Sequence, residues 1–335
     1  MKKGVLILCA LVLCMAAVSG GAQTAAYEPA TVRVAFMPNM GSGSSLITAV
    51  EMGYFKEFGI TVEMTEFQGG PAEISAMASG DIDISQIGHG AHALCIEGQA
   101  VIFGLDVLGM SDVVMGNRSK GIETVEDLKG KTIASTSGTS AEVILQLALS
   151  KAGMTVDDVN IVEMDANGAV SAMVSGNVDA CATWAPSSIT IQNQMGDNVI
   201  TLAGNADFID KVTFPGSFIT TSKYLEGNRD VAVRFATAML KAMDYRKPNI
   251  EEVCKWLATA VEADSELMLA TKDTIEWITG DFIVEALADG TIENYYSGQQ
   301  QVFIDSGRIS QAVPVGDYVM MDIMKDAVEL YLSVK

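Results

Sequence analysis

The residues of this chain best suited to binding chemistry form a row of small hydroxyl side chains, STSGTS, at positions 135–140. The row follows a β-branched run at 131–134 and precedes apolar residues at helical spacing. Thr139 and Glu142 have the spacing of a capping box, which predicts that a helix begins here. Its first N–H groups and its dipole could then receive an oxyanion or another acceptor-rich group. The hydroxyls could instead only cap the helix and turn the chain, and the sequence leaves this alternative open.

The chain has two histidines, and their places along the sequence predict different roles. His89 lies in a turn between two glycines, where we expect it to face a cleft and donate to an anion, although a plain surface position is the alternative. We expect His92 on the helix that follows. Residues 135–142 contain no cation and Glu142 is acidic, which disfavours a bare anion such as nitrate or bicarbonate. A zwitterion or a neutral ligand fits better, with Glu142 or Asp165 available for an ammonium group.

The cysteines and short motifs predict no catalytic or metal centre. Of five cysteines, three lie outside the N-terminal region, and each is widely spaced and surrounded by apolar residues, which favours inert buried thiols. No disulfide framework, zinc spacing, Ser/His/Asp order or Walker loop is present, since GSGSS at 41–45 lacks the Gly-Lys-Ser ending. We therefore expect no cofactor, no metal and no enzymatic activity.

The first 26 residues have the pattern of a secretory signal peptide. Lys2 and Lys3 precede an apolar run that is short for a membrane span, and small residues follow it. We expect cleavage near Ala22 and export across the inner membrane to the periplasm or cell surface. Cys14 could carry a lipid anchor, but the large Leu13 before it disfavours this.

The charge of the chain excludes one class of partner. The full sequence has a net charge of −21, and removal of the two signal lysines lowers it to −23, with 19 basic and 42 acidic residues. A chain this acidic repels nucleic acid, so we expect no nucleic-acid partner. We expect an ordered, globular chain, because 335 residues that are 49% hydrophobic can bury a large core. We also expect a monomer.

The order of the expected elements predicts two similar lobes. Strand, turn and helix alternate through residues 31–90 and again through 131–183, the pattern of a doubly wound sheet flanked by helices. The segment SAMASGDID at 75–83 returns as SAMVSGNVD at 171–179, in the same place within each half. Gly80 and Gly176 are expected to end the two helices in a left-handed conformation. The fold class is therefore α/β with two lobes.

Two apolar, extended segments, 100–116 and 217–222, are expected to be the strands that cross between the lobes as hinges. The chain after residue 225 must then return to the first lobe. The predicted division is a signal peptide at 1–26, lobe 1 at 27–110, lobe 2 at 111–220 and the second part of lobe 1 at 221–335.

Four motifs carry a resemblance to a known family across the whole mature chain. They are A-x-x-x-G-Y-F-x-x-x-G at 49–59, S-G-D-I-D at 79–83, D-L-K-G-K at 127–131 and D-A-x-x-x-W-x-P at 179–186. With these motifs the chain resembles the nitrate/sulfonate/taurine-type substrate-binding proteins of ABC transporters. The resemblance implies a class II periplasmic binding protein whose two lobes close on a small ligand by a hinge motion.

The ligand of such a protein meets the loops at the carboxyl ends of the strands. The predicted ligand-binding residues follow from this rule and from positions that match the family; they are Asn39, Gly41, Ser42, Gly70, Gly88, His89, Ser137, Gly138, Thr139, Ser140, Asn167, Trp184 and Phe214. Trp184 would supply a flat apolar wall, with a core or hinge position as its alternative.

The resemblance implies a small-molecule ligand and a membrane permease with its ATPase as partners. Our first expectation for the ligand is a sulfonate such as taurine or an alkanesulfonate. A neutral heterocycle of the pyrimidine or thiamine-precursor type, nitrate and bicarbonate stay open. An enzyme on a similar fold, the pyridoxal-phosphate-type pyrimidine synthase, is less favoured, because its lysine, histidine and cysteine-rich segment have no match here. A sensory module would need a membrane segment after the domain, which we do not expect.

Overall fold

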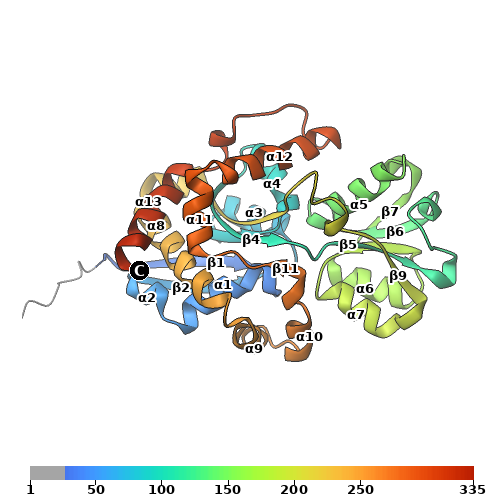
Figure 1. Cartoon of the computed structure of the whole chain (residues 1–335), viewed down its shortest axis with the longest axis horizontal. Coiled ribbons are helices and arrows are strands. Elements are labelled where there is room, and N and C mark those ends of the chain that lie inside the picture. Colours follow the sequence, from blue (N-terminus) through green and yellow to red (C-terminus); the bar gives the residue numbers. More distant parts are fainter. Residues whose placement is uncertain (1–26) are drawn as a thin grey trace, which may run out of the picture.

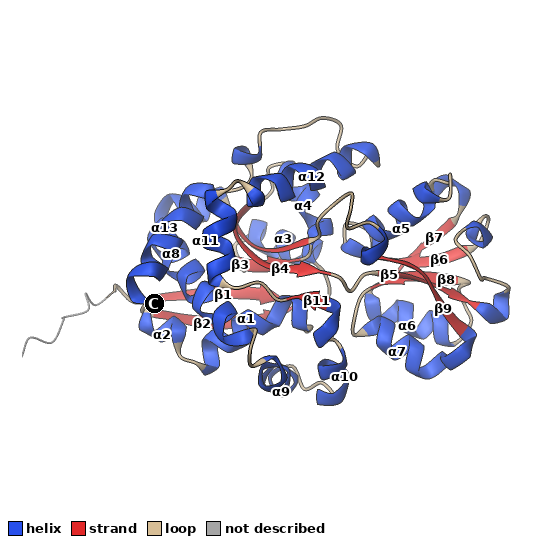
Figure 2. Ribbon diagram, viewed as in Figure 1, coloured by secondary structure: helices blue, strands red, loops and turns tan. Residues whose placement is uncertain are grey.

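The chain from residue 27 to residue 335 forms two lobes that lie side by side in the computed structural model (Figure 1). Each lobe is a β-sheet with helices packed on both of its faces (Figure 2). The two-lobed α/β fold that the sequence predicts is therefore confirmed. The signal peptide predicted at 1–26 lies outside the described residues.

The sheet of the first lobe has six strands in the order β11-β4-β10-β3-β1-β2. The strands are β1 (Ala30–Phe36), β2 (Ile60–Glu66), β3 (Ile84–Ile87), β4 (Val101–Gly109), β10 (Pro215–Thr220) and β11 (Ile275–Glu276). β1 pairs in parallel with β2 and β3, whereas β10 runs antiparallel to both β3 and β4. The parallel half therefore comes from the first βαβαβ run, and later segments complete the sheet.

The sheet of the second lobe has five strands in the order β7-β6-β8-β5-β9 and follows the same plan. The strands are β5 (Val113–Asn117), β6 (Thr132–Ser135), β7 (Asn160–Glu163), β8 (Ala180–Thr183) and β9 (Val199–Gly204). β6 pairs in parallel with β7 and β8, and β5 runs antiparallel to β8 and β9.

Most helices belong to the first lobe, because the chain returns to it after β10 (Figure 1). These helices are α1 (Met40–Glu51), α2 (Tyr54–Glu57), α3 (Gly70–Ser79), α4 (His92–Ile96), α8 (Ser222–Arg246), α9 (Ile250–Ala260), α10 (Ser265–Ala270), α11 (Gly280–Ala288), α12 (Thr291–Asp305) and α13 (Met321–Val334). The second lobe has α5 (Ser140–Lys151), α6 (Ala166–Val174) and α7 (Ser187–Met195).

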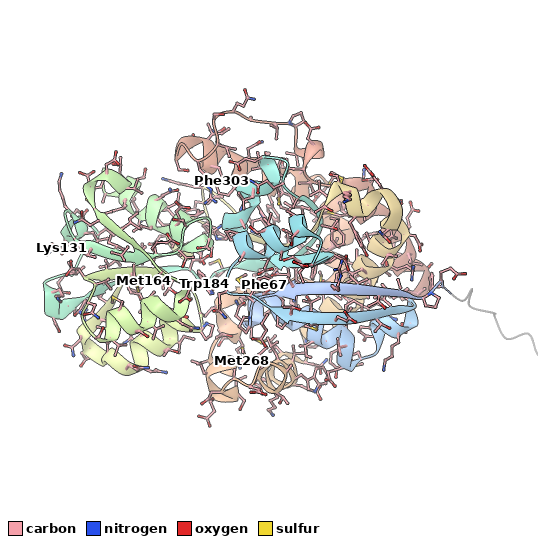
Figure 3. The ribbon with its side chains drawn as sticks, turned by 180° about the vertical axis from the view of Figure 1, so that it is seen from behind. Phe67, Lys131, Met164, Trp184, Met268 and Phe303 are labelled. Carbon is pink, nitrogen blue, oxygen red and sulfur yellow. The ribbon has the colours of Figure 1, made fainter. Side chains whose placement is uncertain are left out.

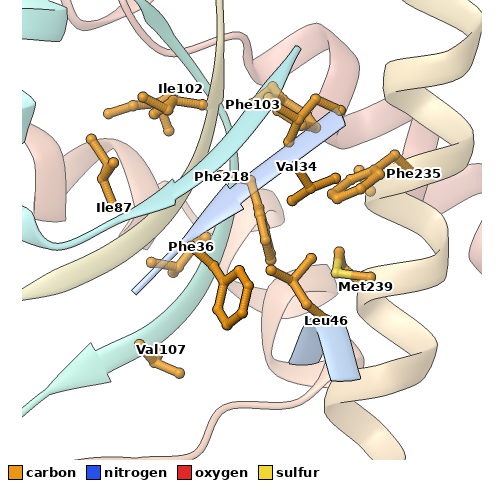
Figure 4. Close-up of a cluster of buried hydrophobic side chains, with 14 of the residues drawn as sticks. Val34, Phe36, Leu46, Ile87, Ile102, Phe103, Val107, Phe218, Phe235 and Met239 are labelled. Carbon is orange, nitrogen blue, oxygen red and sulfur yellow. The ribbon is translucent and has the colours of Figure 1, made fainter. Parts of the chain in front are cut away.

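The core of the first lobe lies between its sheet and α8. Phe103 and Phe218 come from neighbouring strands and Phe235 from α8, and all three are fully buried beside Met239 and Leu46 (Figure 4). The rings of Phe218 and Phe235 meet edge to face, with 5.6 Å between their centroids. Burying a side chain of this size stabilises the folded state by about 1.5–3 kcal/mol. This packing fixes the sheet whose strand ends carry the site.

The repeated segment has the same structural role in both lobes. Gly80 and Gly176 follow the ends of α3 and α6 with φ angles of 85° and 70°, the left-handed conformation that the sequence predicts. The carboxylate of Asp83 then accepts a hydrogen bond from the backbone N–H of Arg33 at 2.9 Å, and that of Asp179 accepts one from the N–H of Thr132, also at 2.9 Å. Each aspartate therefore ties its loop to the neighbouring parallel strand.

Two segments connect the sheets, residues 110–112 between β4 and β5 and residues 205–214 between β9 and β10. The predicted second crossing at 217–222 is wrong, because 217–220 lie inside β10 and pair with β3 and β4. The two crossings run side by side. The N–H of Asp112 donates to the side-chain oxygen of Asn205 at 2.6 Å, and the N–H of Gly109 donates to the carbonyl of Phe214 at 2.7 Å.

Candidate functional site

A cavity of about 70 Å³ lies between the lobes, at the carboxyl ends of the strands. Ten of the thirteen residues predicted to bind ligand line it, namely Asn39, Gly41, Ser42, Gly70, Gly88, His89, Thr139, Ser140, Trp184 and Phe214. Residues that the sequence analysis did not select complete the wall, among them Gln86, Ser111 and Asp112. The structure therefore gathers most of the predicted residues in one place, and their contact with a ligand stays a prediction.

Trp184 forms part of the wall that the second lobe contributes. It follows β8 and lies at the junction of the lobes, beside Phe67 of the first lobe (Figure 3). Trp184 is 9% exposed and lines both the central cavity and a neighbouring pocket that contains Phe67 and Asn167. Asn167 is thus adjacent to the central cavity without lining it.

Two of the predicted residues, Ser137 and Gly138, are outside the cavity. The N–H and hydroxyl of Ser137 both donate to the carboxylate of Glu163, at 2.9 and 2.6 Å, on the exposed side of the turn. The N–H of Gly138 donates to Glu142 at 2.9 Å. These donors already have acidic partners within the protein, so the structure does not present them to a ligand.

The start of α5 differs from the predicted capping box. Thr139 is the N-cap residue, as the sequence predicts, but its hydroxyl donates to the carbonyl of Thr136 at 2.7 Å and caps no N–H of the helix. The carboxylate of Glu142 accepts from Gly138 and forms a 2.7 Å ion pair with Arg308. Glu142 lies outside the cavity lining and is already engaged, so the structure gives no support to the prediction that it binds a ligand's ammonium group.

Asp165, the other acid suggested for an ammonium group, is also engaged elsewhere. It is the N-cap of α6, and its carboxylate accepts the N–H of Gly168 at 2.7 Å. It does not line the central cavity.

The N-terminus of α1 forms the floor of the cavity on the first lobe. Asn39 caps this helix by accepting the N–H of Ser42 at 3.0 Å. The Ser42 hydroxyl accepts the N–H of Met37 at 2.9 Å and donates to the carbonyl of Gln86 at 3.1 Å, so its bonds are internal. The first N–H groups of a helix have no partner within it. The backbone N–H of Gly41, a residue that lines the cavity, is therefore a donor that α1 can offer to a ligand.

A buried polar layer supports this floor from below. Gln86 donates to the carbonyl of Gly41 at 2.9 Å and to Asp106 at 3.2 Å. Asp106 forms a fully buried ion pair with Arg246 at 2.9 Å, and Arg246 also donates to the hydroxyl of Ser44 at 3.0 Å. The layer fixes the turn before α1, because each member is hydrogen-bonded to the next.

Asp112, in the first crossing segment, is the main residue that sequence reasoning missed. Its carboxylate accepts hydrogen bonds from His89 at 2.9 Å, Ser140 at 2.5 Å and Asn205 at 3.0 Å. Burial alone would raise the pKa of Asp112, but hydrogen bonds from these three residues outweigh it and bring the pKa below its ordinary value. The available signal was an acid placed within the apolar run 100–116.

His89 lies in the cavity wall, where the sequence analysis expected it. Its Nε2 faces Asp112, its ring packs against Phe214 with 4.9 Å between centroids, and the side chain is 4% exposed. His92 is fully buried behind it, with Nδ1 bonded to Gln299 at 2.7 Å, and burial lowers the pKa of His92 to about 3. His89 is thus the histidine of the cavity, and His92 belongs to the core.

The lobes touch each other around the cavity. The backbone of Gly90 in the turn η1 (His89–Ala91) lies directly against the start of α5, where an added Cβ would come within 2.0 Å of the carbonyl carbon of Thr139. A Cβ added at Gly138 would likewise lie 2.8 Å from Pro71 of the first lobe. The Glu142–Arg308 ion pair also joins the lobes. This arrangement is a closed form.

Within residues 27–335 the structure holds no cluster of three or more acidic, histidine or cysteine side chains that could bind a metal. Cys95, Cys181 and Cys254 are buried and unpaired by disulfides, and burial raises the thiol pKa of Cys181 to about 12 and that of Cys254 to about 11. Over the same residues, no helix has both the length and the hydropathy needed to cross a membrane.

Comparison with known proteins finds a family match and several relatives. The model of a family described as NMT1/THI5 like matches residues 43–252. A protein of Brucella abortus (strain 2308) that is named as a binding protein is 31% identical over 87% of this chain and 90% of its own length. A Bacillus subtilis (strain 168) protein named for binding aliphatic sulfonates is 28% identical over 85% and 87%. The taurine-binding periplasmic protein of Escherichia coli (strain K12) is 24% identical over 69% and 71%.

Solved structures show the same fold at lower sequence identity. The alkanesulfonate-binding protein of Xanthomonas axonopodis pv. citri, bound to MOPS, superposes with a TM-score of 0.67 at 21% identity, over 88% of this chain and 99% of that one. The periplasmic nitrate-binding protein of Synechocystis PCC 6803 gives 0.73 at 14% identity, over 90% and 89%. A desulfurization enzyme gives 0.60 at 14% identity, over 90% and 99%.

Proposed function

Because the chain belongs to the NMT1/THI5-like family, we propose that it is an extracytoplasmic solute-binding protein of an ABC importer, and that its ligand is a small sulfonate. The observation that carries the proposal is the meeting of two helix N-termini over one cavity. α1 comes from the first lobe and α5 from the second, and residues at the start of each line the same space. Two helix N-termini favour a negatively charged group between them.

The walls of the cavity suit the rest of a sulfonate. Trp184 and Phe214 provide apolar surface from the second lobe and the second crossing, and Val107 and Ile275 provide it from the first lobe. A sulfonate has a compact charged head, which N–H groups can bind, and an alkanesulfonate adds a short apolar tail, which can pack against aromatic rings. The named sulfonate and taurine specificities of the relatives point in the same direction.

The structure favours a simple alkanesulfonate over taurine. Asp112 is the acidic residue among those that line the cavity, and both of its oxygens already accept hydrogen bonds. An ammonium group would have to compete with His89, Ser140 and Asn205 for these oxygens, so its desolvation would be only partly offset. This differs from the zwitterion that the sequence alone favours, because Glu142 is turned toward Arg308.

A binding role without turnover fits the chemistry of the lining. His89 and Asp112 are the ionisable residues of the cavity, and no lysine that could form an imine with a cofactor lines it. The desulfurization enzyme shares the fold, which by itself assigns no activity. We also propose that the chain is exported, by the signal peptide at 1–26, and delivers its ligand as a monomer to a membrane permease with its ATPase.

A thermal-shift screen of the mature protein tests the ligand class. Methanesulfonate, ethanesulfonate and butanesulfonate should raise the melting temperature, because a ligand that binds only the folded state stabilises it. Taurine should raise it less than ethanesulfonate, its match in carbon and sulfonate count. Nitrate, bicarbonate and a hydroxymethylpyrimidine serve as the other ligand classes.

Two results would contradict the proposal. One is a shift produced by the heterocycle or by nitrate while every sulfonate leaves the melting temperature unchanged. The other is the disappearance of a bound sulfonate, or release of sulfite from it, during incubation with the purified protein, which would show an enzyme.

A further inference from the structure

The imidazole of His89 is buried in the cavity wall with one of its two nitrogens unsatisfied. Nε2 lies 2.9 Å from Asp112, whereas Nδ1 has no hydrogen-bond partner among residues 27–335. The residue is 3% exposed. A buried polar atom without a partner costs free energy until a ligand or a water molecule meets it. Nδ1 is therefore a buried, unpartnered atom of a residue that lines the cavity, and a ligand could supply its missing partner.

The charge of the cavity depends on the protonation of this ring. His89 and Asp112 are the ionisable groups of the lining. The hydrogen bonds to Asp112 keep its carboxylate ionised, so the cavity carries one negative charge when His89 is neutral and none when it is protonated. An anion is repelled in the first state. In the second state it finds a neutral pair and an Nδ1–H that can donate to it.

Among the described residues, no other group packed against His89 changes the net charge of the cavity. His92, on the adjoining helix, is held neutral because burial lowers its pKa to about 3. Gln299 of α12 donates to the carbonyl of His89 at 3.0 Å and carries no charge, and Phe214 of the second crossing is apolar. From the second lobe, Glu142 is paired with Arg308 outside the lining.

We infer that binding of an anionic ligand is coupled to the uptake of one proton by His89, with Asp112 as the residue that positions the ring. The inference rests on the proposed function in one respect, the negative charge of the ligand. Histidine is the side chain that ordinarily changes charge between pH 5 and 8. Affinity for a sulfonate therefore falls as the pH rises, by up to about tenfold per pH unit where one proton is linked to binding.

Titration calorimetry with methanesulfonate measures this uptake directly when it is repeated, at each pH, in two buffers that differ in ionisation enthalpy and carry neither a sulfonate nor a phosphate group. Methanesulfonate stays ionised throughout, so protons that the buffer releases are taken up by the protein. The uptake per ligand should be larger at pH 8.5 than at pH 5.5. His89→Gln keeps an amide that can bond to Asp112 but cannot be protonated. The His89→Gln variant should take up no proton when it binds methanesulfonate, and its affinity should not depend on pH. At pH 5.5 it should bind about ten- to a hundredfold more weakly than the unaltered protein.

Two further variants separate this coupling from a merely structural effect. His92→Gln can keep the contact with Gln299. This variant should bind methanesulfonate and take up as many protons per ligand as the unaltered protein does. Asp112→Asn should move the loss of affinity to lower pH, because the charge that favours the protonated ring is gone.

The outcomes distinguish the inference from the proposed function. Sulfonate binding with no proton uptake at pH 8.5, or with equal uptake in the folded His89→Gln variant, would overturn the inference and leave the proposed function standing. Failure of the folded, unaltered protein to bind any sulfonate at either pH would overturn both.

Discussion

Ser140 and Ser137 lie three residues apart in one turn and have different surroundings. The hydroxyl of Ser140 faces the cavity and donates to Asp112 at 2.5 Å, whereas that of Ser137 is exposed and bonded to Glu163. We predict that Ser140→Ala weakens alkanesulfonate binding by about tenfold. Asp112 loses the hydrogen bond from the Ser140 hydroxyl, so its negative charge repels the sulfonate more strongly. Ser137→Ala is the matched control and should change the dissociation constant by less than about twofold, as measured by calorimetry. Equal losses in the two variants would contradict the assignment.

Glu73 gives a prediction about stability that is independent of the ligand. It is fully buried against Ser85, and burial raises the pKa of Glu73 from 4.5 to about 8. The folded state therefore holds a proton that the unfolded chain gives up at lower pH. The stability from this group is fully present below pH 4.5 and is lost as the pH rises through 8, at up to about 1.4 kcal/mol per pH unit.

Glu73→Gln, which imitates the protonated acid, should remove this loss. Its free energy of unfolding relative to the unaltered protein should increase between pH 5 and pH 8, by at most about 4 kcal/mol. Urea denaturation at the two pH values measures the difference. Glu66→Gln, at an exposed carboxylate of the same lobe, should show no such change. A constant difference between Glu73→Gln and the unaltered protein would show that the acid is ionised in the fold.

The sequence predicted those single residues whose surroundings are local. His89 between two glycines and Thr139 before an apolar run are each positioned by their neighbours in the chain, and the structure places both at the cavity. The roles of Glu142 and Asp112 could not be predicted in this way. Their partners Arg308 and Asn205 lie 166 and 93 positions away, so only the folded chain brings the charges together.

At the scale of the elements, α5 and the segment after α12 form a contact between the lobes that lies outside the cavity. Arg308 and Glu142 pair at 2.7 Å with side-chain exposures of 13% and 25%. A partly exposed pair of this kind is worth about 1 kcal/mol or less. The pair should therefore stabilise the closed form and increase the affinity for any ligand that needs closure.

We predict that Arg308→Ala and Glu142→Ala each weaken sulfonate binding by about two- to fivefold. The double variant should bind no more weakly than Glu142→Ala alone, because that change already removes the ion pair together with the bond to Gly138. Calorimetry on the four proteins at low and high salt measures the coupling, which salt should reduce. Simple additivity of the two losses would show that the residues act separately.

The elements themselves follow the sequence closely where a period or a repeat defines them. The βαβαβ runs and the two copies of the SGD/SGN turn appear as predicted, since alternation and left-handed glycines are local properties. The predicted crossing at 217–222 was wrong, because residues 217–220 belong to β10 within the sheet of the first lobe. An apolar, extended segment fits either a crossing or a sheet interior, and its pairing with β3 and β4 is decided by contacts far along the chain.

At the scale of the whole molecule, closure depends on how near the backbones of the two lobes can come. At Gly90 the two backbones are in direct contact, since a Cβ there would lie 2.0 Å from the carbonyl carbon of Thr139 and 2.3 Å from the nitrogen of Ser140. Real side chains do not tolerate such distances, and the atoms they would meet are backbone. Any side chain at position 90 must therefore hold the lobes apart, although each lobe can fold without change.

We accordingly predict that Gly90→Ala folds and melts like the unaltered protein but cannot close. Small-angle scattering with saturating ethanesulfonate should show a decrease in the radius of gyration for the unaltered protein and none for the variant. Sulfonate affinity should fall by at least about a hundredfold, because the groups contributed by α5 no longer reach a ligand held by α1. Gly298→Ala, where an added Cβ has no atom within 4 Å, is the matched control and should close normally. A Gly90→Ala protein that contracts and binds like the control would show that the ligand is held without this contact between η1 and α5.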